Sequence, residues 1–246
     1  MSARIVLSLA LCTAFALLLP RQAHAQCVAA PGVPCAANSI LPCGMNLVGS
    51  SAAAPVADPA GNFSITVFDG TAGGGAPIIG ADVWLDFTAC CNDVRLSSSQ
   101  FGPGMVLLAA LKQVHGTSGP GGVVTFRIMG AASNLAATPG AGCATVWATN
   151  AGSTVLLSDG ISWPPAMQVG AYDLNGALAG GAGLSAADLA LLLNDFFNTP
   201  PYRARDDYDY NVLCVQVVGP SDIARWLNVY FASGSTTNGP GFVVCP

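Results

Sequence analysis

Acidic and amide side chains that could bind a metal ion recur in the C-terminal third of the chain, at an offset of 34 residues. The first set is Asp173, Asn175 and Asp188, and the second is Asp207, Asp209, Asn211 and Asp222. Oxygen ligands at alternate loop positions, closed by a carboxylate further along, are typical of calcium sites. The two sets therefore predict calcium binding. We expect the second site to be tighter, because it has four side-chain ligands rather than three.

These residues belong to a longer internal duplication. When residues 173–197 are aligned with residues 207–231, six of the 25 positions are identical without a gap. In both units apolar residues follow the loop at the helical spacing i, i+3, i+4, i+7, i+8, which predicts two amphipathic helices with their stripes packed against each other. The stripes are Leu189, Leu192, Leu193, Phe196 and Phe197, and Ile223, Trp226, Leu227, Tyr230 and Phe231. Ser185 with Asp188 predicts a capping box, and Gly219-Pro220 predicts the start of the second helix.

The duplicated loop–helix unit resembles the dockerin-type repeat, a variant of the EF-hand. The resemblance implies one calcium ion per loop, bound by the residues above, and docking onto a cohesin-like or surface protein partner. The closing Asp lies fifteen positions after the first Asp here and eleven positions after it in the family, and Leu178 and Val212 replace the family's turn glycine. The alternative is a metal-free structural pair in which Asp188 and Asp222 only cap their helices.

Upstream of this duplication the hydrophobic pattern has a period of two, which is typical of half-buried strands. The clearest segments are 62–68, 82–88 and 123–129. Gly- and Pro-rich turns separate them, which favours an antiparallel β-sandwich. The stretches FDGTAGGGAPIIGADVWLDF, GGVVTFRI and GCATVWAT resemble bacterial immunoglobulin-like domains of the invasin type. We therefore expect a mainly β chain with a small α part: an immunoglobulin-like sandwich at 26–165 and a dockerin-like domain at 166–246, divided near Trp163-Pro164-Pro165.

Residues 1–25 have the pattern of a secretory signal peptide. Arg4 precedes the apolar segment 5–19, and Ala23-His24-Ala25 fits a cleavage site, so we expect cleavage near Ala25. The apolar segment is too short to span a membrane, and no later segment is longer, so we expect no membrane span in the mature protein. Eight of the nine cysteines would remain, which predicts disulfides. We expect Cys214 to pair with Cys245, and the adjacent Cys90 and Cys91 to bond to other cysteines.

The residue inventory argues against catalysis and against nucleic acid. The chain has no Glu, and His115 would be the one histidine left after cleavage; we expect it to be a surface or hydrogen-bonded residue. Its net charge of −5, with 8 basic against 13 acidic residues, lacks the basic excess of a nucleic-acid-binding protein. Trp84, Trp147 and Trp163 could form an aromatic binding face, but their residue type favours packing in the core.

These observations predict a secreted or cell-surface bacterial protein that is not an enzyme. Its expected function is binding and scaffolding, with the duplicated unit acting as a calcium-stabilised docking module. One alternative is a structural cell-surface protein with a degenerate, metal-free repeat. Another is a carbohydrate-binding accessory of a glycan-degrading system.

Overall fold

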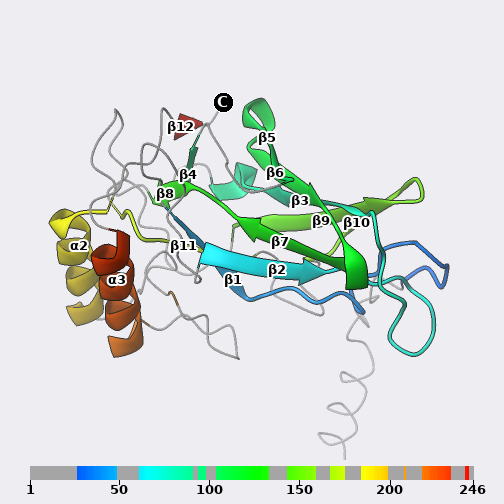
Figure 1. Ribbon diagram of the computed structural model, residues 1–246, viewed down its shortest axis with the longest axis horizontal. Helices are drawn as coiled ribbons and strands as arrows, with labels where there is room; N and C mark the ends of the chain where they lie inside the picture. Colours follow the sequence, from blue (N-terminus) through cyan, green and yellow to red (C-terminus); the bar gives the residue numbers. More distant parts are fainter. Residues whose placement is uncertain are drawn as a thin grey trace, which may run out of the picture.

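The computed structural model describes residues 27–48, 61–90, 94–97, 104–132, 143–158, 167–174, 184–198, 208, 218–233 and 242–243. Within these ranges the chain is mainly β with two α-helices at one end (Figure 1). The prediction of a mainly β chain with a small helical part is therefore confirmed. The predicted signal peptide lies outside the described residues. No helix among the described residues combines the length and the apolar character needed to cross a membrane.

The largest sheet has five antiparallel strands. Its order is β10 (Ser153–Leu156), β9 (Thr145–Asn150), β3 (Asp82–Asp86), β6 (Gln113–Thr117) and β5 (Val106–Leu108). The predicted period of two is present in the central strand: Val83 and Leu85 are fully buried, while Trp84 between them faces the other side of the sheet. The sheet therefore has one buried face and one face turned outward.

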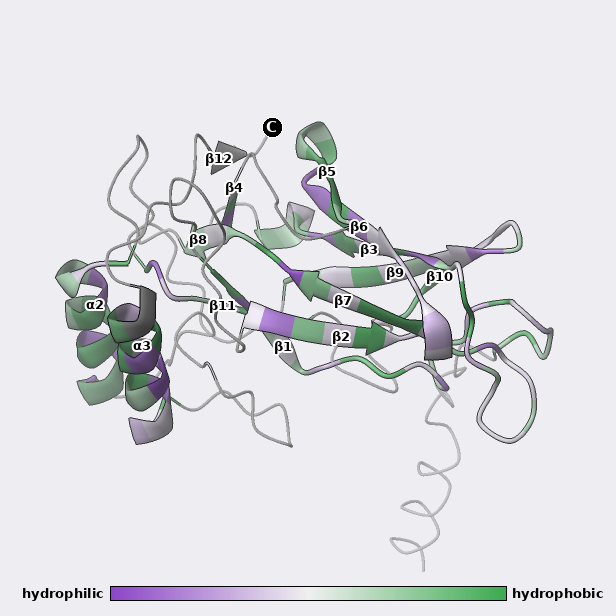
Figure 2. Cartoon of the chain, in the orientation of Figure 1, coloured by the Kyte–Doolittle hydropathy of each residue, from purple (hydrophilic) through white to green (hydrophobic). Residues whose placement is uncertain are grey.

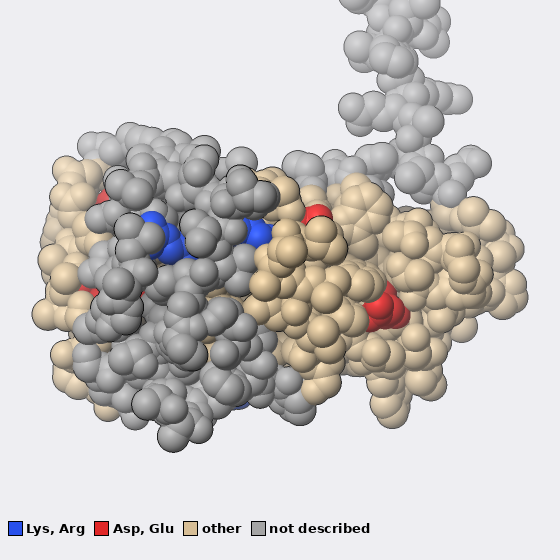
Figure 3. Space-filling model, turned by 90° about the horizontal axis from the view of Figure 1, so that it is seen from above, with Lys and Arg blue, Asp and Glu red and all other residues tan. Residues whose placement is uncertain are grey.

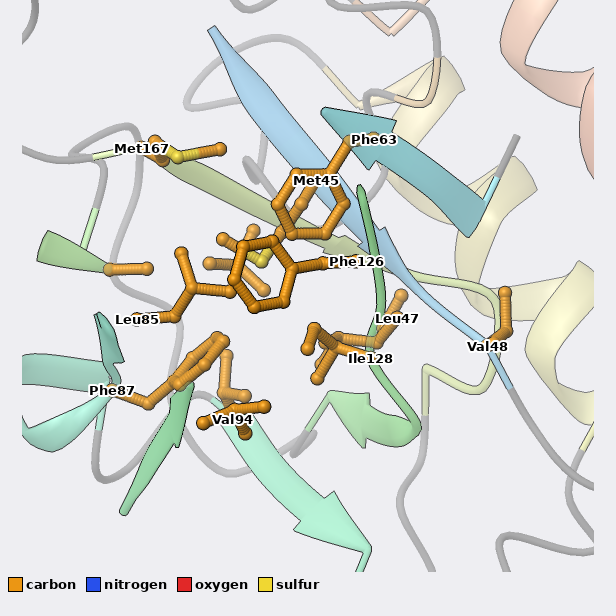
Figure 4. Packing of buried hydrophobic residues seen from close by; sticks show 14 of the residues in the cluster. Met45, Leu47, Val48, Phe63, Leu85, Phe87, Val94, Phe126, Ile128 and Met167 are labelled. Carbon is orange, nitrogen blue, oxygen red and sulfur yellow. The ribbon is translucent and has the colours of Figure 1, made fainter. Parts of the chain in front are cut away.

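A second layer covers the buried face of the five-stranded sheet. Strands β2 (Asn62–Thr66) and β7 (Val123–Arg127) pair antiparallel and contribute Phe63 and Phe126 to the core. A β-carbon added at Gly116 of β6 would lie 3.2 Å from Val124 Cγ2 and 3.3 Å from Phe126 Cε1, so the two layers touch at this glycine. Figure 4 shows Phe126 beside Leu85 in this core, and Figure 2 shows hydrophobic residues among more polar ones along β2 and β7.

Two smaller sheets complete the β part. β12 (Phe242–Val243), β4 (Val94–Ser97) and β8 (Gly130–Ala132) form an antiparallel sheet of three strands. β1 (Gly44–Leu47) and β11 (Gln168–Ala171) pair in parallel. Since β11 follows the predicted domain boundary at residue 165, its pairing with β1 joins the C-terminal segment to the β part. Short 3-10 turns lie at Thr88–Cys90, Ala109–Leu111 and Pro120–Gly122.

The helices α2 (Ala186–Phe197) and α3 (Pro220–Ser233) lie side by side at one end of the β part (Figure 1). Ser185 caps α2 and forms the predicted capping box with Asp188. The predicted apolar stripes are buried only in part. The buried positions are Asp188, Leu192 and Asp195 on α2, and Asp222, Trp226 and Val229 on α3. Phe197 and Phe231 are 76% and 78% exposed, so the prediction that they are packed between the helices is wrong.

Disulfide bonds join segments that are distant in the sequence. Cys27 pairs with Cys35, and Cys90 pairs with Cys143, which links the end of β3 to the residues before β9. Cys43 is also disulfide-bonded. Cys90 therefore bonds away from its neighbour Cys91, as predicted, whereas the predicted Cys214–Cys245 pair lies outside the described residues. Disulfides are typical of proteins that fold in an oxidising compartment.

The buried carboxylate of Asp69 organises the turn-rich segment after β2. Its Oδ1 accepts hydrogen bonds from the backbone and the hydroxyl of Thr71, at 3.1 and 2.6 Å, and from Ala76 N, at 2.8 Å. Its Oδ2 accepts one from Gly32 N at 3.1 Å, which ties the N-terminal segment to the same loop. These hydrogen bonds, the one from the Thr71 hydroxyl above all, hold the pKa of Asp69 well below its usual range.

We expect Asp69→Asn to lower the melting temperature at neutral pH and to have less effect in acid. A depressed pKa stabilises the fold above the unfolded-state pKa of about 3.9, and this contribution is lost as the pH falls toward the folded-state pKa. The difference in melting temperature between wild type and variant should therefore have its largest value at pH 7 and should decrease below about pH 4. Thermal melts across this range, followed by circular dichroism, measure it, and an equal difference at both ends would contradict the prediction.

Candidate functional site

A groove of about 400 Å³ lies on the outward face of the five-stranded sheet. Its lining residues come from four adjacent strands, and each occupies an outward position in the period-two pattern. They are Asp82, Trp84 and Asp86 of β3, Gln113 of β6, Trp147 and Thr149 of β9, and Thr154 of β10. The same alternation that buries Val83 and Leu85 therefore presents two indoles and two carboxylates together on the outside.

The strand register arranges these side chains in rows across the sheet. In the central row, Trp84 is directly opposite His115 on one side and Trp147 on the other. A row of polar residues lies on each side of this aromatic row. One contains Thr117, Asp82, Thr149 and Thr154, and the other contains Gln113, Asp86 and Thr145. Residues directly opposite on adjacent strands have their β-carbons about 4.5–5.5 Å apart, so each row is a contact row.

His115 holds the indole of Trp84 from the side away from the groove. The two rings are stacked, with centroids 4.2 Å apart and an angle of 8° between their planes. His115 Nδ1 lies 2.8 Å from Asp82 Oδ1, within hydrogen-bond distance, so the imidazole is fixed at both its ring face and its edge. The expectation that His115 is a hydrogen-bonded residue is confirmed. Since Trp84 lines the groove and His115 does not, the other face of this indole is turned toward the groove.

Asp86 contributes a negative charge to the groove, and both of its carboxylate oxygens already accept hydrogen bonds. Its Oδ1 accepts a hydrogen bond from Thr88 N at 2.8 Å, and its Oδ2 accepts one from Gln113 Nε2 at 2.9 Å. Burial raises the pKa of Asp86, but hydrogen bonding from Thr88 and Gln113 outweighs burial and leaves the pKa below its usual value. Asp86 is therefore ionised at neutral pH.

Other polar atoms of the groove keep hydrogen-bonding capacity. Among the described residues, no hydrogen bond reaches Asp82 Oδ2 or Gln113 Oε1. Thr149 and Thr154 share one hydrogen bond of 3.0 Å between their hydroxyls. None of the lining residues is basic, and on the right-hand part of the surface in Figure 3 the charged side chains in view are acidic. The groove thus offers flat aromatic surface bordered by hydrogen-bond acceptors and negative charge.

The expectation that the tryptophans pack in the core is wrong for Trp84 and Trp147. Both are half-buried and occupy outward positions of their strands, between the buried pairs Val83 and Leu85 and Val146 and Ala148. Trp163 lies outside the described residues. The signal was present in the alternating pattern of residues 82–86, which places Trp84 on the same face as two aspartates. An indole that alternates in step with two aspartates lies on the polar face of the strand, even though tryptophan itself is hydrophobic.

The closing aspartates of the duplicated unit have matching hydrogen bonds. Asp188 Oδ1 accepts from Leu174 N at 2.7 Å, and its Oδ2 accepts from the backbone and the hydroxyl of Ser185, both at 2.8 Å. Asp222 Oδ1 accepts from Tyr208 N at 2.6 Å, and its Oδ2 accepts from Gly219 N at 2.7 Å. Leu174 and Tyr208 are 34 residues apart, as are Ser185 and Gly219, so the duplication in sequence is also a duplication in structure.

The other predicted calcium ligands are only partly within the described chain. The backbone carbonyl of the buried Asp173 accepts a hydrogen bond from Ala132 N at 2.8 Å. Asn175, Asp207, Asp209 and Asn211 lie outside the described residues. Within the ranges that the structure describes, no group of three or more His, Cys, Asp or Glu side chains gathers in a way that could hold a metal ion. Calcium binding stays a prediction.

No protein-family model, no curated protein and no solved structure matches this chain.

Proposed function

We propose that this chain is an exported, non-enzymatic binding protein that holds a carbohydrate in the groove on its five-stranded sheet. The observation that carries the proposal is the cross-strand pair of Trp84 and Trp147 with carboxylates in the rows on either side. A sugar ring has apolar C–H faces and a polar edge of hydroxyl groups. Indole faces suit the former, and carboxylate, amide and hydroxyl oxygens suit the latter.

The position of the groove on a sheet supports the same proposal. Trp84 and Trp147 extend from paired β-strands, and the stacked His115 further restricts the Trp84 ring. Side chains fixed before the ligand arrives lose little conformational entropy on binding, which raises the affinity that a shallow site can reach. We propose that the two β layers form an immunoglobulin-like sandwich, with the groove on its outer surface.

A calcium-stabilised docking module remains a second proposal, for the helical end of the molecule. It is supported by the corresponding backbone hydrogen bonds of Asp188 and Asp222 and by the equivalent, exposed Phe197 and Phe231. A cohesin-like or surface protein would be its partner. An ion at either closing aspartate would share the carboxylate oxygens with the backbone N–H groups that now donate to them. The two proposals are compatible, because they use different parts of the chain.

Glycan binding and the absence of turnover can be measured together. We expect the oxidised protein to bind at least one soluble oligosaccharide saturably in isothermal titration calorimetry. Chromatography of the oligosaccharide after long incubation should show an unchanged chain length, since the proposal is for binding without hydrolysis. Failure to bind any member of a broad glycan panel would contradict the binding proposal, and shortened products would contradict the non-enzymatic part of it.

A further inference from the structure

The charged side chains that line the groove are all negative. Asp82 and Asp86 lie two positions from Trp84 on the same strand, one on each side of it, and no lining residue is basic. Like charges repel strongly where water is partly excluded, whereas an opposite charge at the same place is attracted. A glycan rich in carboxylate or sulfate groups would therefore be repelled, and a glycan with positive charge would be attracted.

The geometry at Asp82 defines where a positive group would lie. Asp82 Oδ1 is bonded to His115, and its Oδ2 has no hydrogen-bond partner among the described residues. The face of Trp84 that His115 leaves uncovered lines the same groove. An ammonium group beside Asp82 would donate a charge-assisted hydrogen bond to Oδ2 and would also be attracted to the indole face.

Acetylation of that amino group would remove its positive charge, on which both contributions depend. The amide that results carries no charge: its N–H could donate only a neutral hydrogen bond to Oδ2, which is weaker than a charge-assisted one, and it has no cation–π attraction to the indole. The groove therefore discriminates between a free and an acetylated amino sugar, although the two rings have the same shape.

On the basis of the proposed carbohydrate-binding function, we infer that the groove selects glycans with free amino groups, that is, oligomers of deacetylated amino sugars. Asp82 would bind the ammonium group, and Asp86 would supply negative charge. Trp84 and Trp147 would pack against the sugar rings. Asp86 acts through its charge because both its oxygens already accept hydrogen bonds.

The test is a calorimetric comparison of three oligomers of equal length: glucosamine, N-acetylglucosamine and galacturonic acid. We expect the glucosamine oligomer to bind at least about tenfold more tightly than the N-acetylated one. The galacturonic acid oligomer should not bind. Raising the ionic strength from about 0.01 M to about 1 M should weaken the glucosamine complex in particular, because salt screens the charge attraction.

Asp82→Asn keeps the shape of the side chain and removes its charge. We expect this variant to lose about tenfold in affinity for the glucosamine oligomer and to keep its affinity for any neutral oligomer. Asp195→Asn, on helix α2, changes the net charge equally and should leave the affinity unchanged. The three-ligand comparison and the salt series need only the wild-type protein, so they decide the inference even if a variant folds poorly.

The outcomes separate the inference from the function on which it rests. Equal or tighter binding of the N-acetylated or the acidic oligomer would overturn the selection for amino groups and would leave carbohydrate binding intact. Failure of all three oligomers and of the broader glycan panel would overturn both. Tight, salt-sensitive binding of the glucosamine oligomer that Asp82→Asn weakens would support both.

Discussion

Replacing Trp84 with alanine is expected to lower the affinity for the glycan about 30-fold or more, and Trp147→Ala should act in the same direction. Aromatic side chains at the centre of a binding site commonly contribute 2 kcal/mol or more, and about 1.4 kcal/mol corresponds to a factor of ten. Trp84 should have the larger effect, because His115 already holds its ring in place. Isothermal titration calorimetry with the tightest-binding glycan measures both changes.

The control is an outward residue of the same sheet that does not line the groove. Val106 on β5 is 47% exposed, and Val106→Ala should leave the affinity unchanged. Trp84→Phe, which keeps an aromatic face, should recover part of the loss. Circular dichroism would verify that all variants are folded. If Trp84→Ala and Trp147→Ala both stay within about threefold of wild type, the aromatic row is not the binding surface.

The sequence was sufficient to place Trp84 on a strand, but it did not show that Trp84, His115 and Trp147 come together at a groove. Alternation in residues 82–88 predicted the strand that the structure has at Asp82–Asp86, and in the same way it predicted β2 and β7. Each predicted strand is two residues too long at its end, because the buried Phe87 and its counterparts Val67 and Ile128 continue the pattern after the ladder has ended. Hydrophobic alternation reports burial, whereas strand ends depend on pairing partners.

Which residues face Trp84 depends on register between distant segments. β3 pairs with β6 on one side and with β9 on the other, and these pairings bring His115 and Trp147 beside Trp84. No local pattern encodes a pairing between strands so far apart, so the three aromatic residues look unrelated in the sequence. Because tryptophan is commonly a core residue, Trp84 and Trp147 were expected on the buried face of the sheet, whereas they lie on the outward face.

The helices were predicted well as elements but wrongly in orientation. Their heptad-like pattern fits two helices that bury their stripes against each other alone. In the structure, α3 and the residue Tyr208 before it also bond to the end of β11: Trp226 Nε1 donates a hydrogen bond of 2.9 Å to the carbonyl of Tyr172, and Tyr208 OH donates one of 3.0 Å to that of Ala171. The buried face therefore rotates to Asp222, Trp226 and Val229, and Phe231 becomes exposed.

This same interface makes Asp222 the residue with the largest expected effect on stability. Asp222 is completely buried and binds Tyr208 N and Gly219 N, which join the loop to the first turn of α3. Hydrogen bonds to a charged group contribute about 1.5–3 kcal/mol each, so Asp222→Ala should lower the free energy of unfolding by about 3–5 kcal/mol. Asp188→Ala should have a similar effect because its hydrogen bonds are equivalent. Asn228→Ala, at an exposed position of α3, should change it by less than about 0.5 kcal/mol.

Urea unfolding of these variants, with calcium and with a chelator, would measure the effect and also test the docking module. The backbone hydrogen bonds predict a large loss of stability for Asp222→Ala in both conditions, and an unchanged free energy of unfolding would contradict this role. A calcium ion bound only by the folded wild type would add about 2.7 kcal/mol at a hundredfold excess over its dissociation constant. If that gain is present in wild type and absent in Asp222→Ala, the carboxylate is both a loop-closing acceptor and a calcium ligand. If calcium leaves the wild type unchanged, the duplicated aspartates stabilise the fold through their N–H partners alone, and the calcium proposal fails.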